Sequence, residues 1–216
     1  TPAFYDVGGD HASLYLEIGL ALLPLGELAR VKLPDFSLDG PARRELRHAW
    51  HRLQHEHCSF EVLEGDAADA HLVELRRDPH AWTTDKHASP RRWIGLGWAD
   101  ESWSGRPLAV VRRGGETIAA GSIWCGDQNS ELTVEALRPR QGAPDGVLEY
   151  LLVEAALWGQ KRGFEWFELG SAPHGPVDEH ALAPLWERVG PSLYRHGEHF
   201  ATFAALRQFK ERFDPI

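Results

Sequence analysis

The stretch LAVVRRGGETIAAGSIWC, residues 108–125, decides how the centre of the chain folds. Two apolar runs flank the pair Gly114-Gly115, and paired glycines between apolar runs are a strong signal for a β-hairpin. We therefore expect strands over residues 108–112 and 117–125. The run ELTVEAL, residues 131–137, is expected to add a third strand to this meander.

Further elements flank the meander on both sides. Phe60 and Val62 lie in an apolar strand, and the helix that follows is stopped by Pro79. A glycine-bearing loop at residues 142–146 comes after the meander. We expect helices over residues 67–78, 147–162, 179–189 and 203–212, and strands over residues 92–98 and 164–169. This order resembles that of the GNAT-type acyltransferases, an α/β (α+β) fold.

The first forty residues are expected to form short strands and turns. Leu14, Leu16 and Ile18 alternate with other residues, as a half-buried strand requires. Residues 27–33 are the expected hairpin partner. This stretch is too short to hold its own core, so we interpret residues 1–40 as the end of a domain that begins outside the chain.

Residues 41–57 are expected to form a helix with a basic surface. Leu46, Trp50 and Leu53 recur at the spacing of one helical face. The remaining surface carries four arginines: Arg43, Arg44, Arg47 and Arg52. They form either a strip that binds phosphates or an ordinary solvated face. The net charge of −9 argues against a nucleic-acid partner, but a local basic patch can outweigh the total.

Composition narrows the class of protein. The 216 residues are 43% hydrophobic and 25% charged, as in a soluble globular protein. No apolar run is long enough to cross a bilayer. The two cysteines lack CxxC spacing, so a disulfide framework is unsupported. Twelve histidines include no HExxH motif, and we expect no metal site.

The loop before the helix at 147–162 is expected to approach an anion, because a helix N-terminus favours negative charge. Here the loop reads RQGAPDG, residues 140–146. Pro144 has no N–H group to offer, and Asp145 adds negative charge. The loop therefore argues against an ordinary acetyl-CoA site.

Five stretches together carry a more specific resemblance. They read ARVKLPDFSLDGPARRELR (29–47), ELTVEALRPR (131–140), LLVEAALWGQKRGFEWFELGSAP (151–173), LAPLWERVG (182–190) and YRHGEHFATFAALRQFKERFDP (194–215). In this order they resemble the C-terminal synthase region of bacterial phosphatidylglycerol aminoacyltransferases, the lysyl- and alanyl-phosphatidylglycerol synthases of the multiple peptide resistance factor family. The resemblance implies two tandem GNAT-like domains joined by a basic helix. Residues 1–40 would end the first domain, 41–57 would be the linker helix, and 58–216 the second, catalytic domain.

The resemblance also implies a reaction. An amino acid, lysine or alanine, moves from aminoacyl-tRNA to a glycerol hydroxyl of phosphatidylglycerol, with aminoacyl-tRNA as co-substrate and neither metal nor redox cofactor. The implied place is the cytoplasmic face of the bacterial cell membrane. There this soluble fragment would belong with a membrane-spanning N-terminal region of the same protein. The resemblance also implies a role in resistance to antimicrobial peptides and antibiotics.

The family's strand motif VDLMR matches Glu135 and Arg138 of this chain. Arg138 would bind the lipid phosphate or the developing oxyanion, because a guanidinium offers a rigid fork of donors. Glu135 would orient the substrate or relay the proton. Residues three apart on a regular strand face opposite sides, so a shared site requires a bulge or a strand end. A surface ion pair is the alternative.

A second group of matched residues lies towards the C-terminus. Glu198 would hold the amino group of the transferred amino acid, and His199 would assist proton transfer. Substrate contacts are implied for Ser171, Tyr194 and Lys210, and a contact with tRNA phosphate is implied for Arg212. Ordinary structural roles remain the alternative for His199, Lys210 and Arg212.

Three other functions remain open. One is a tRNA-dependent transferase that loads a cell-wall precursor or a peptide. Another is an acetyl-CoA-dependent acetyltransferase, which would require a working pyrophosphate loop at residues 140–146. The third is a degenerate module of this fold that only binds RNA or a partner. The presence of Glu135, Arg138 and Glu198 argues against this last possibility.

Overall fold

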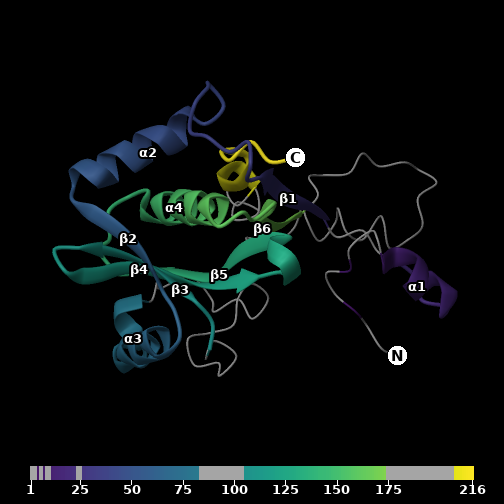
Figure 1. Cartoon of the computed structure of the whole chain (residues 1–216), viewed down its shortest axis with the longest axis horizontal. Coiled ribbons are helices and arrows are strands. Elements are labelled where there is room, and N and C mark those ends of the chain that lie inside the picture. The colour runs from purple at the N-terminus through teal and green to yellow at the C-terminus, as the bar shows by residue number, and fades with distance from the viewer. Residues whose placement is uncertain (1–3, 5–6, 8–10, 23–25, 83–104, 174–206) are drawn as a thin grey trace, which may run out of the picture. The chain divides into compact units, whose positions relative to one another are not determined.

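The computed structural model describes residues 4, 7, 11–22, 26–82, 105–173 and 207–216 (Figure 1). These residues belong to two compact units. One unit comprises residues 1–29 and 170–210, and the other comprises residues 30–169 and 211–216. The second unit contains most of the sheet, including strand β5 (Glu131–Pro139) with Glu135 and Arg138.

The described strands form one six-stranded sheet in the order β1-β6-β5-β4-β3-β2. The strands are β1 Gly26–Lys32, β2 Cys58–Leu63, β3 Leu108–Arg113, β4 Glu116–Cys125, β5 Glu131–Pro139 and β6 Trp166–Pro173. The helices are α1 Ala12–Glu17, α2 Arg44–His55, α3 Asp66–Arg77 and α4 Val147–Lys161, with short 3-10 helices η2 Pro79–Trp82 and η4 Asp127–Asn129. Neighbouring strands from β2 to β5 are antiparallel, whereas β5 and β6 are parallel.

The meander predicted from residues 108–137 is confirmed. Gly114 and Gly115 both have positive φ angles, 60° and 86°, in the turn between β3 and β4. Such angles favour glycine, which is why the pair marks this hairpin. The α/β order of a GNAT-like fold is confirmed with it, because β2, α3, the meander, α4 and β6 follow one another as expected.

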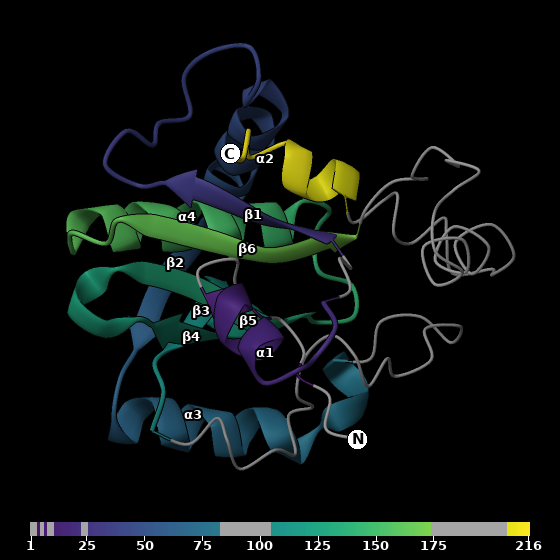
Figure 2. The same ribbon diagram turned by 90° about the vertical axis from the view of Figure 1, so that its right-hand side faces the viewer.

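Helices cover both faces of this sheet. Figures 1 and 2 both show α4 along one face and α3 on the other. On the α4 face, Leu132 and Phe167 are completely buried. Gly159 of α4 approaches β5 so closely that a Cβ atom there would lie 2.5 Å from Cδ2 of Leu132. The absence of a side chain at Gly159 therefore lets helix and sheet pack closely.

On the opposite face, α3 rests on β3 and β4. Asp66 and Asp69 lie in its first turn and Arg76 and Arg77 in its last turn, so the charges complement the helix dipole. An apolar cluster joins the helix to the sheet: Ala68, Leu72, Leu75, Trp82, Leu108, Val110 and Ala120. Ala120 thereby identifies which face of β4 points towards α3.

The prediction of a strand around Leu14, Leu16 and Ile18 was wrong. Residues Ala12–Glu17 form helix α1, and all three of these side chains are exposed. Three alternating apolar residues are too few to fix a period, and the sequence ASLYLE contains no β-branched residue, so helix propensity prevails. The strand expected at residues 27–33 is present as β1, but its neighbour in the sheet is β6.

Helix α2 lies within the predicted range 41–57. The domain boundaries at residues 40 and 57 stay a prediction. The elements expected at residues 92–98 and 179–189 lie outside the described residues. Among the helices that the structure describes, none combines the length and the apolar character that crossing a membrane requires.

Candidate active site

A β-bulge in β5 brings Glu135 and Arg138 to the same face of the sheet. Across the β4–β5 ladder, Ser122 pairs with Glu135 and Ala120 pairs with Arg138, with a register shift between the two pairs. Ala136, inside the bulge, has a φ of 47°. Residues two apart on β4 share a face, and so do their cross-strand partners, which makes the two charged residues neighbours on the α3 face.

Gly121 makes room for this bulge. A Cβ atom at this position would lie 2.6 Å from Cγ1 of Val134, 3.1 Å from Cδ2 of Leu137 and 3.3 Å from the main-chain oxygen of Glu135. Contacts this short are not tolerated without a shift of β5. The glycine in β4 therefore supports the local conformation of β5.

Arg138 is a partly desolvated cation without a carboxylate partner among the described residues. Its guanidinium is half-buried, and this burial lowers the pKa of Arg138. Its Nη1 atom donates a hydrogen bond to the main-chain oxygen of Leu137 at 3.1 Å. No ion pair joins it to an acidic residue within the described parts of the chain. A guanidinium held in this way offers its remaining donors to an anion.

Glu135 complements Arg138 in position but does not neutralise it. Its side chain is exposed and makes no hydrogen bond or ion pair with any residue that the structure describes. Its cross-strand partner Ser122 is a further polar residue of this face. Only 2% of Ser122 is exposed, and its Oγ atom has no hydrogen-bond partner in the described ranges. The three residues form the candidate active site.

The described ladder between β5 and β6 ends before Glu135. The parallel β5–β6 ladder pairs Thr133 with Glu168 and ends there, although both strands continue. Thr133 Oγ1 donates a hydrogen bond to the main-chain oxygen of Glu168 at 2.9 Å, at the last pair of the ladder. Glu135 and Arg138 therefore follow the last described pair of this ladder.

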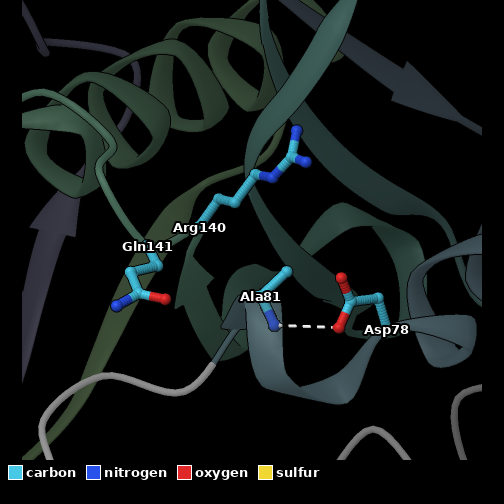
Figure 3. A pocket seen from close by; sticks show the side chains of 4 residues that line it. All are labelled: Asp78, Ala81, Arg140 and Gln141. Atoms are coloured by element: carbon cyan, nitrogen blue, oxygen red, sulfur yellow. Dashed lines mark hydrogen bonds between the residues drawn. The ribbon is translucent and has the colours of Figure 1, made fainter.

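A hollow of about 320 Å³ lies where β5 leads into the loop at residues 140–146 (Figure 3). Asp78, Ala81, Arg140 and Gln141 line it. Asp78 Oδ1 accepts a hydrogen bond from the N–H of Ala81 at 3.2 Å, and Arg140 pairs with Glu116 at 2.9 Å. The cation of this hollow is thus already neutralised, which does not favour a phosphate ligand.

Three of the four arginines on the basic helix support the fold. Arg43 donates hydrogen bonds to the main-chain oxygens of Ser37 and Phe213, at 3.0 and 3.1 Å. Arg47 binds the oxygens of Leu38 and Gly40. The third of these arginines, Arg52, donates to the oxygen of Asp145.

Arg44 differs from the other three arginines. Its side chain is exposed and has no hydrogen bond or ion pair to any residue in the described ranges. A tRNA contact of this helix stays a prediction for all four arginines. Among them, Arg44 is the one whose side chain has no partner in the described residues.

The C-terminal residues have separate surroundings. Arg212 bridges Glu45 of α2 and Glu149 of α4, at 3.1 and 2.8 Å, so it joins two helices. Lys210 is only 7% exposed, and its Nζ atom is 3.6 Å from where a Cβ of Gly170 would lie. Neither finding tests the predicted tRNA or substrate contacts of these residues.

Four predicted site residues cannot be placed. Tyr194, Glu198 and His199 lie outside the described residues. Ser171 belongs to strand β6, and the position of its side chain is not described. Their roles remain those that the resemblance implies.

A polar cluster beneath α3 was not predicted from the sequence. The Nε2 atom of His71 lies 3.0 Å from Thr117 Oγ1, at hydrogen-bond distance. Its Nδ1 atom lies 3.1 Å from a carboxylate oxygen of Glu74. Arg112 donates to the same Thr117 hydroxyl at 3.1 Å and pairs with Glu61. Because the Glu74 carboxylate can only accept, Nδ1 carries the proton of a neutral His71, and Nε2 accepts a hydrogen bond from the Thr117 hydroxyl.

The fold defines a class of protein, the acyltransferases of GNAT-like fold. The family within this class follows from the sequence, because the model of the family "Phosphatidylglycerol lysyltransferase, C-terminal" matches residues 1–216. The chain therefore belongs to this family.

Curated relatives carry the same name. A phosphatidylglycerol lysyltransferase of Bacillus subtilis is 30% identical over 215 residues, which are 98% of this chain and 25% of the relative. One from Staphylococcus xylosus is 27% identical over 214 residues, again 98% of this chain and 25% of the relative. The chain thus spans about a quarter of the length of these relatives.

Two solved structures show a similar fold. The C-terminal domain of a putative lysylphosphatidylglycerol synthetase from Agrobacterium fabrum has a TM-score of 0.80 and 29% identity, covering 99% of this chain and 64% of that chain. L-PGS from Bacillus licheniformis has a TM-score of 0.76 and 26% identity, covering 96% and 62%.

Proposed function

We propose that this chain is the transferase portion of an enzyme that moves an amino acid from aminoacyl-tRNA to a glycerol hydroxyl of phosphatidylglycerol. The observation that carries the proposal is the presence of Glu135 and Arg138, both without ion-pair partners in the described residues, on one face of the bulged strand. The names of the relatives support the lipid substrate and lysine as the transferred amino acid.

The proposed step is an exchange of esters. The lipid hydroxyl oxygen forms a bond to the aminoacyl carbonyl carbon, and the bond from that carbon to the ribose oxygen of tRNA breaks. The hydroxyl proton passes to the departing ribose oxygen. Glu135 relays this proton as general base and then as general acid, since a carboxylate within reach of the attacking hydroxyl suits that role.

Arg138 supports the same step by binding negative charge. Either the lipid phosphate or the oxyanion of the tetrahedral intermediate would fit its guanidinium, which burial has partly stripped of water. A cation already paired with a carboxylate would have to break that pair first. Arg138 has no such pair to break in the described part of the molecule.

Partners and place follow from the same proposal. The remaining three quarters of the relatives' length leave room for a membrane-spanning N-terminal region. The transferase portion would then work at the cytoplasmic face of the bacterial membrane, with aminoacyl-tRNA arriving from the cytoplasm. Neither a metal nor a redox cofactor takes part in the proposed exchange.

The test uses the full-length protein with phosphatidylglycerol vesicles and tRNAs charged with radiolabelled lysine or alanine. We expect labelled lipid with one charged tRNA, which would define the amino acid as well. Label in a soluble acceptor instead of lipid would indicate the cell-wall or peptide alternative. Turnover of acetyl-CoA without labelled lipid would contradict the proposal.

A further inference from the structure

We infer that Ser122 is a positioning residue for Glu135, whose carboxylate accepts a hydrogen bond from the Ser122 hydroxyl once substrate is bound. This inference rests on the proposed function, because it assigns Glu135 the proton relay.

The first reason is the unsatisfied hydroxyl of Ser122. The residue is 2% exposed, and its Oγ atom has no hydrogen-bond partner among the residues that the structure describes. A buried polar atom without a partner costs stability, so such atoms are uncommon and require an explanation. Thr117 on the same strand shows the usual situation, because its buried hydroxyl bonds both His71 and Arg112.

The second reason is the position of Ser122 between two partners of different character. On β3 it pairs with Leu108, which offers no polar side-chain atom, and on β5 it pairs with Glu135. Cβ atoms of cross-strand partners lie about 4.5–5.5 Å apart, which the two side chains can span together. Glu135 is exposed and without a partner in the described residues, so its side chain is free to turn towards Ser122.

The third reason is chemical. A hydroxyl that donates to a carboxylate favours the ionised form, which is the form that accepts a proton from the lipid hydroxyl. One carboxylate oxygen of Glu135 would be held by Ser122, and the other would face the reacting groups. Because the bulge fixes Glu135 and Arg138 on one face, this hydrogen bond would also orient the carboxylate relative to the guanidinium.

The experiment compares Ser122→Ala with the matched control Thr117→Val in the full-length enzyme. Ser122→Ala removes a hydroxyl that has no hydrogen-bond partner among the described residues, so we expect its Tm to equal or exceed that of the wild type. We expect kcat to fall about tenfold or more, because a positioned proton relay is worth at least that much. Thr117→Val should show the opposite pattern, with a lower Tm and little change in kcat.

The pH dependence supplies a readout that a purely structural role would not change. The acid limb of the kcat profile, which reports the substrate complex, should move to higher pH in Ser122→Ala, whereas the limb of kcat/KM should stay in place. Ser122→Cys, which keeps the size but donates weakly, should fall between Ser and Ala.

Several outcomes would overturn the inference. Unchanged kcat and an unchanged acid limb in a folded Ser122→Ala variant would do so, and so would a loss of activity that parallels a loss of Tm. If the wild type uses another acyl donor or acceptor, the same variants are compared with those substrates. In that case the proposed substrates are wrong, but the inference about Ser122 is still tested. A wild type inert towards every donor would overturn both proposals.

Discussion

Gly121 and Val134 approach each other so closely across the β4–β5 ladder that a Cβ atom on Gly121 would lie 2.6 Å from Cγ1 of Val134. The same Cβ atom would meet the main-chain oxygen of Glu135 at 3.3 Å. Replacement of this glycine therefore pushes on the main chain at the start of the bulge, and the arrangement of the site depends on a residue that carries no functional group.

The variant Gly121→Ala should lose both stability and transfer activity. Overpacking of this kind costs about 1–3 kcal/mol in the free energy of unfolding, to be measured by denaturant titration. Activity should fall by more than the unfolded fraction explains, because Glu135 and Arg138 shift relative to each other. Gly159→Ala is the control, since its Cβ atom would meet Leu132 on the face of the sheet opposite to Glu135 and Arg138. It should destabilise the protein while the folded fraction keeps its activity.

Arg138→Ala should abolish most of the transfer while the fold remains intact. Removing a donor to a developing oxyanion typically costs 10²- to 10³-fold in rate, and we expect a loss of about this size in kcat/KM. Because burial already disfavours the charged form of Arg138, Arg138→Met should be at least as stable as the wild type. If a folded Arg138→Ala variant kept wild-type rates, the assignment of Arg138 to the active site would be wrong.

The stability of the protein should depend on pH through His71. Burial, together with the nearby Arg112, lowers the pKa of His71. In the unfolded chain His71 therefore binds a proton near pH 6.5, whereas in the folded protein it stays neutral at this pH. The free energy of unfolding falls as the pH drops from about 6.5 towards the lowered pKa.

The corresponding experiment measures the free energy of unfolding between about pH 7.5 and about pH 5. The contribution of one histidine cannot exceed about 1.4 kcal/mol per pH unit. His71→Gln should flatten the curve by this contribution. Identical slopes in both proteins would show that His71 titrates alike in the folded and unfolded states.

Neighbouring arginines on α2 should respond differently to substitution. Arg43→Ala removes hydrogen bonds to Ser37 and Phe213 and should cost about 1–3 kcal/mol in unfolding free energy. Arg44→Ala should change stability by less than about 0.5 kcal/mol, because this exposed side chain has no described partner.

Binding of tRNA provides a second test of Arg44. If Arg44 contacts a phosphate, its removal should weaken tRNA binding and reduce the slope of log K against log salt by about 0.7–0.9. Binding titrations at several salt concentrations would measure this slope. Equal affinity and slope in Arg44→Ala and wild type would exclude Arg44 from the proposed basic strip.

The parts of the fold that were predictable are those where a local pattern has a single physical meaning. Gly114-Gly115 between apolar runs determines a hairpin, and the structure has one there. The alternation of Leu14, Leu16 and Ile18 is also compatible with a short helix, and helix α1 formed. The pattern led to a wrong prediction because it covers too few residues to distinguish the period of a strand from that of a helix.

The candidate site could be proposed from the sequence only through the family resemblance and through the spacing of Glu135 and Arg138 along the strand. The family motif singled out Glu135 and Arg138, and their spacing of three required a bulge, which is present at Ala136. Ser122 gave no signal, because a serine within an apolar strand reads as a core residue of small volume. The proposed role of Ser122 rests on its burial, on its neighbours and on a hydroxyl without a hydrogen-bond partner among the described residues.

The early end of the β5–β6 ladder at Thr133 and Glu168 has a consequence for mutagenesis. Beyond this pair, the described ladder uses no N–H or C=O group of β5 on its β6 side, and every amino acid except proline supplies both groups. An ester carbonyl or an amino group recognised there would be insensitive to side-chain exchange. Alanine scanning would then under-report the contacts of this strand, whereas proline substitution or a backbone ester in place of an amide would reveal them.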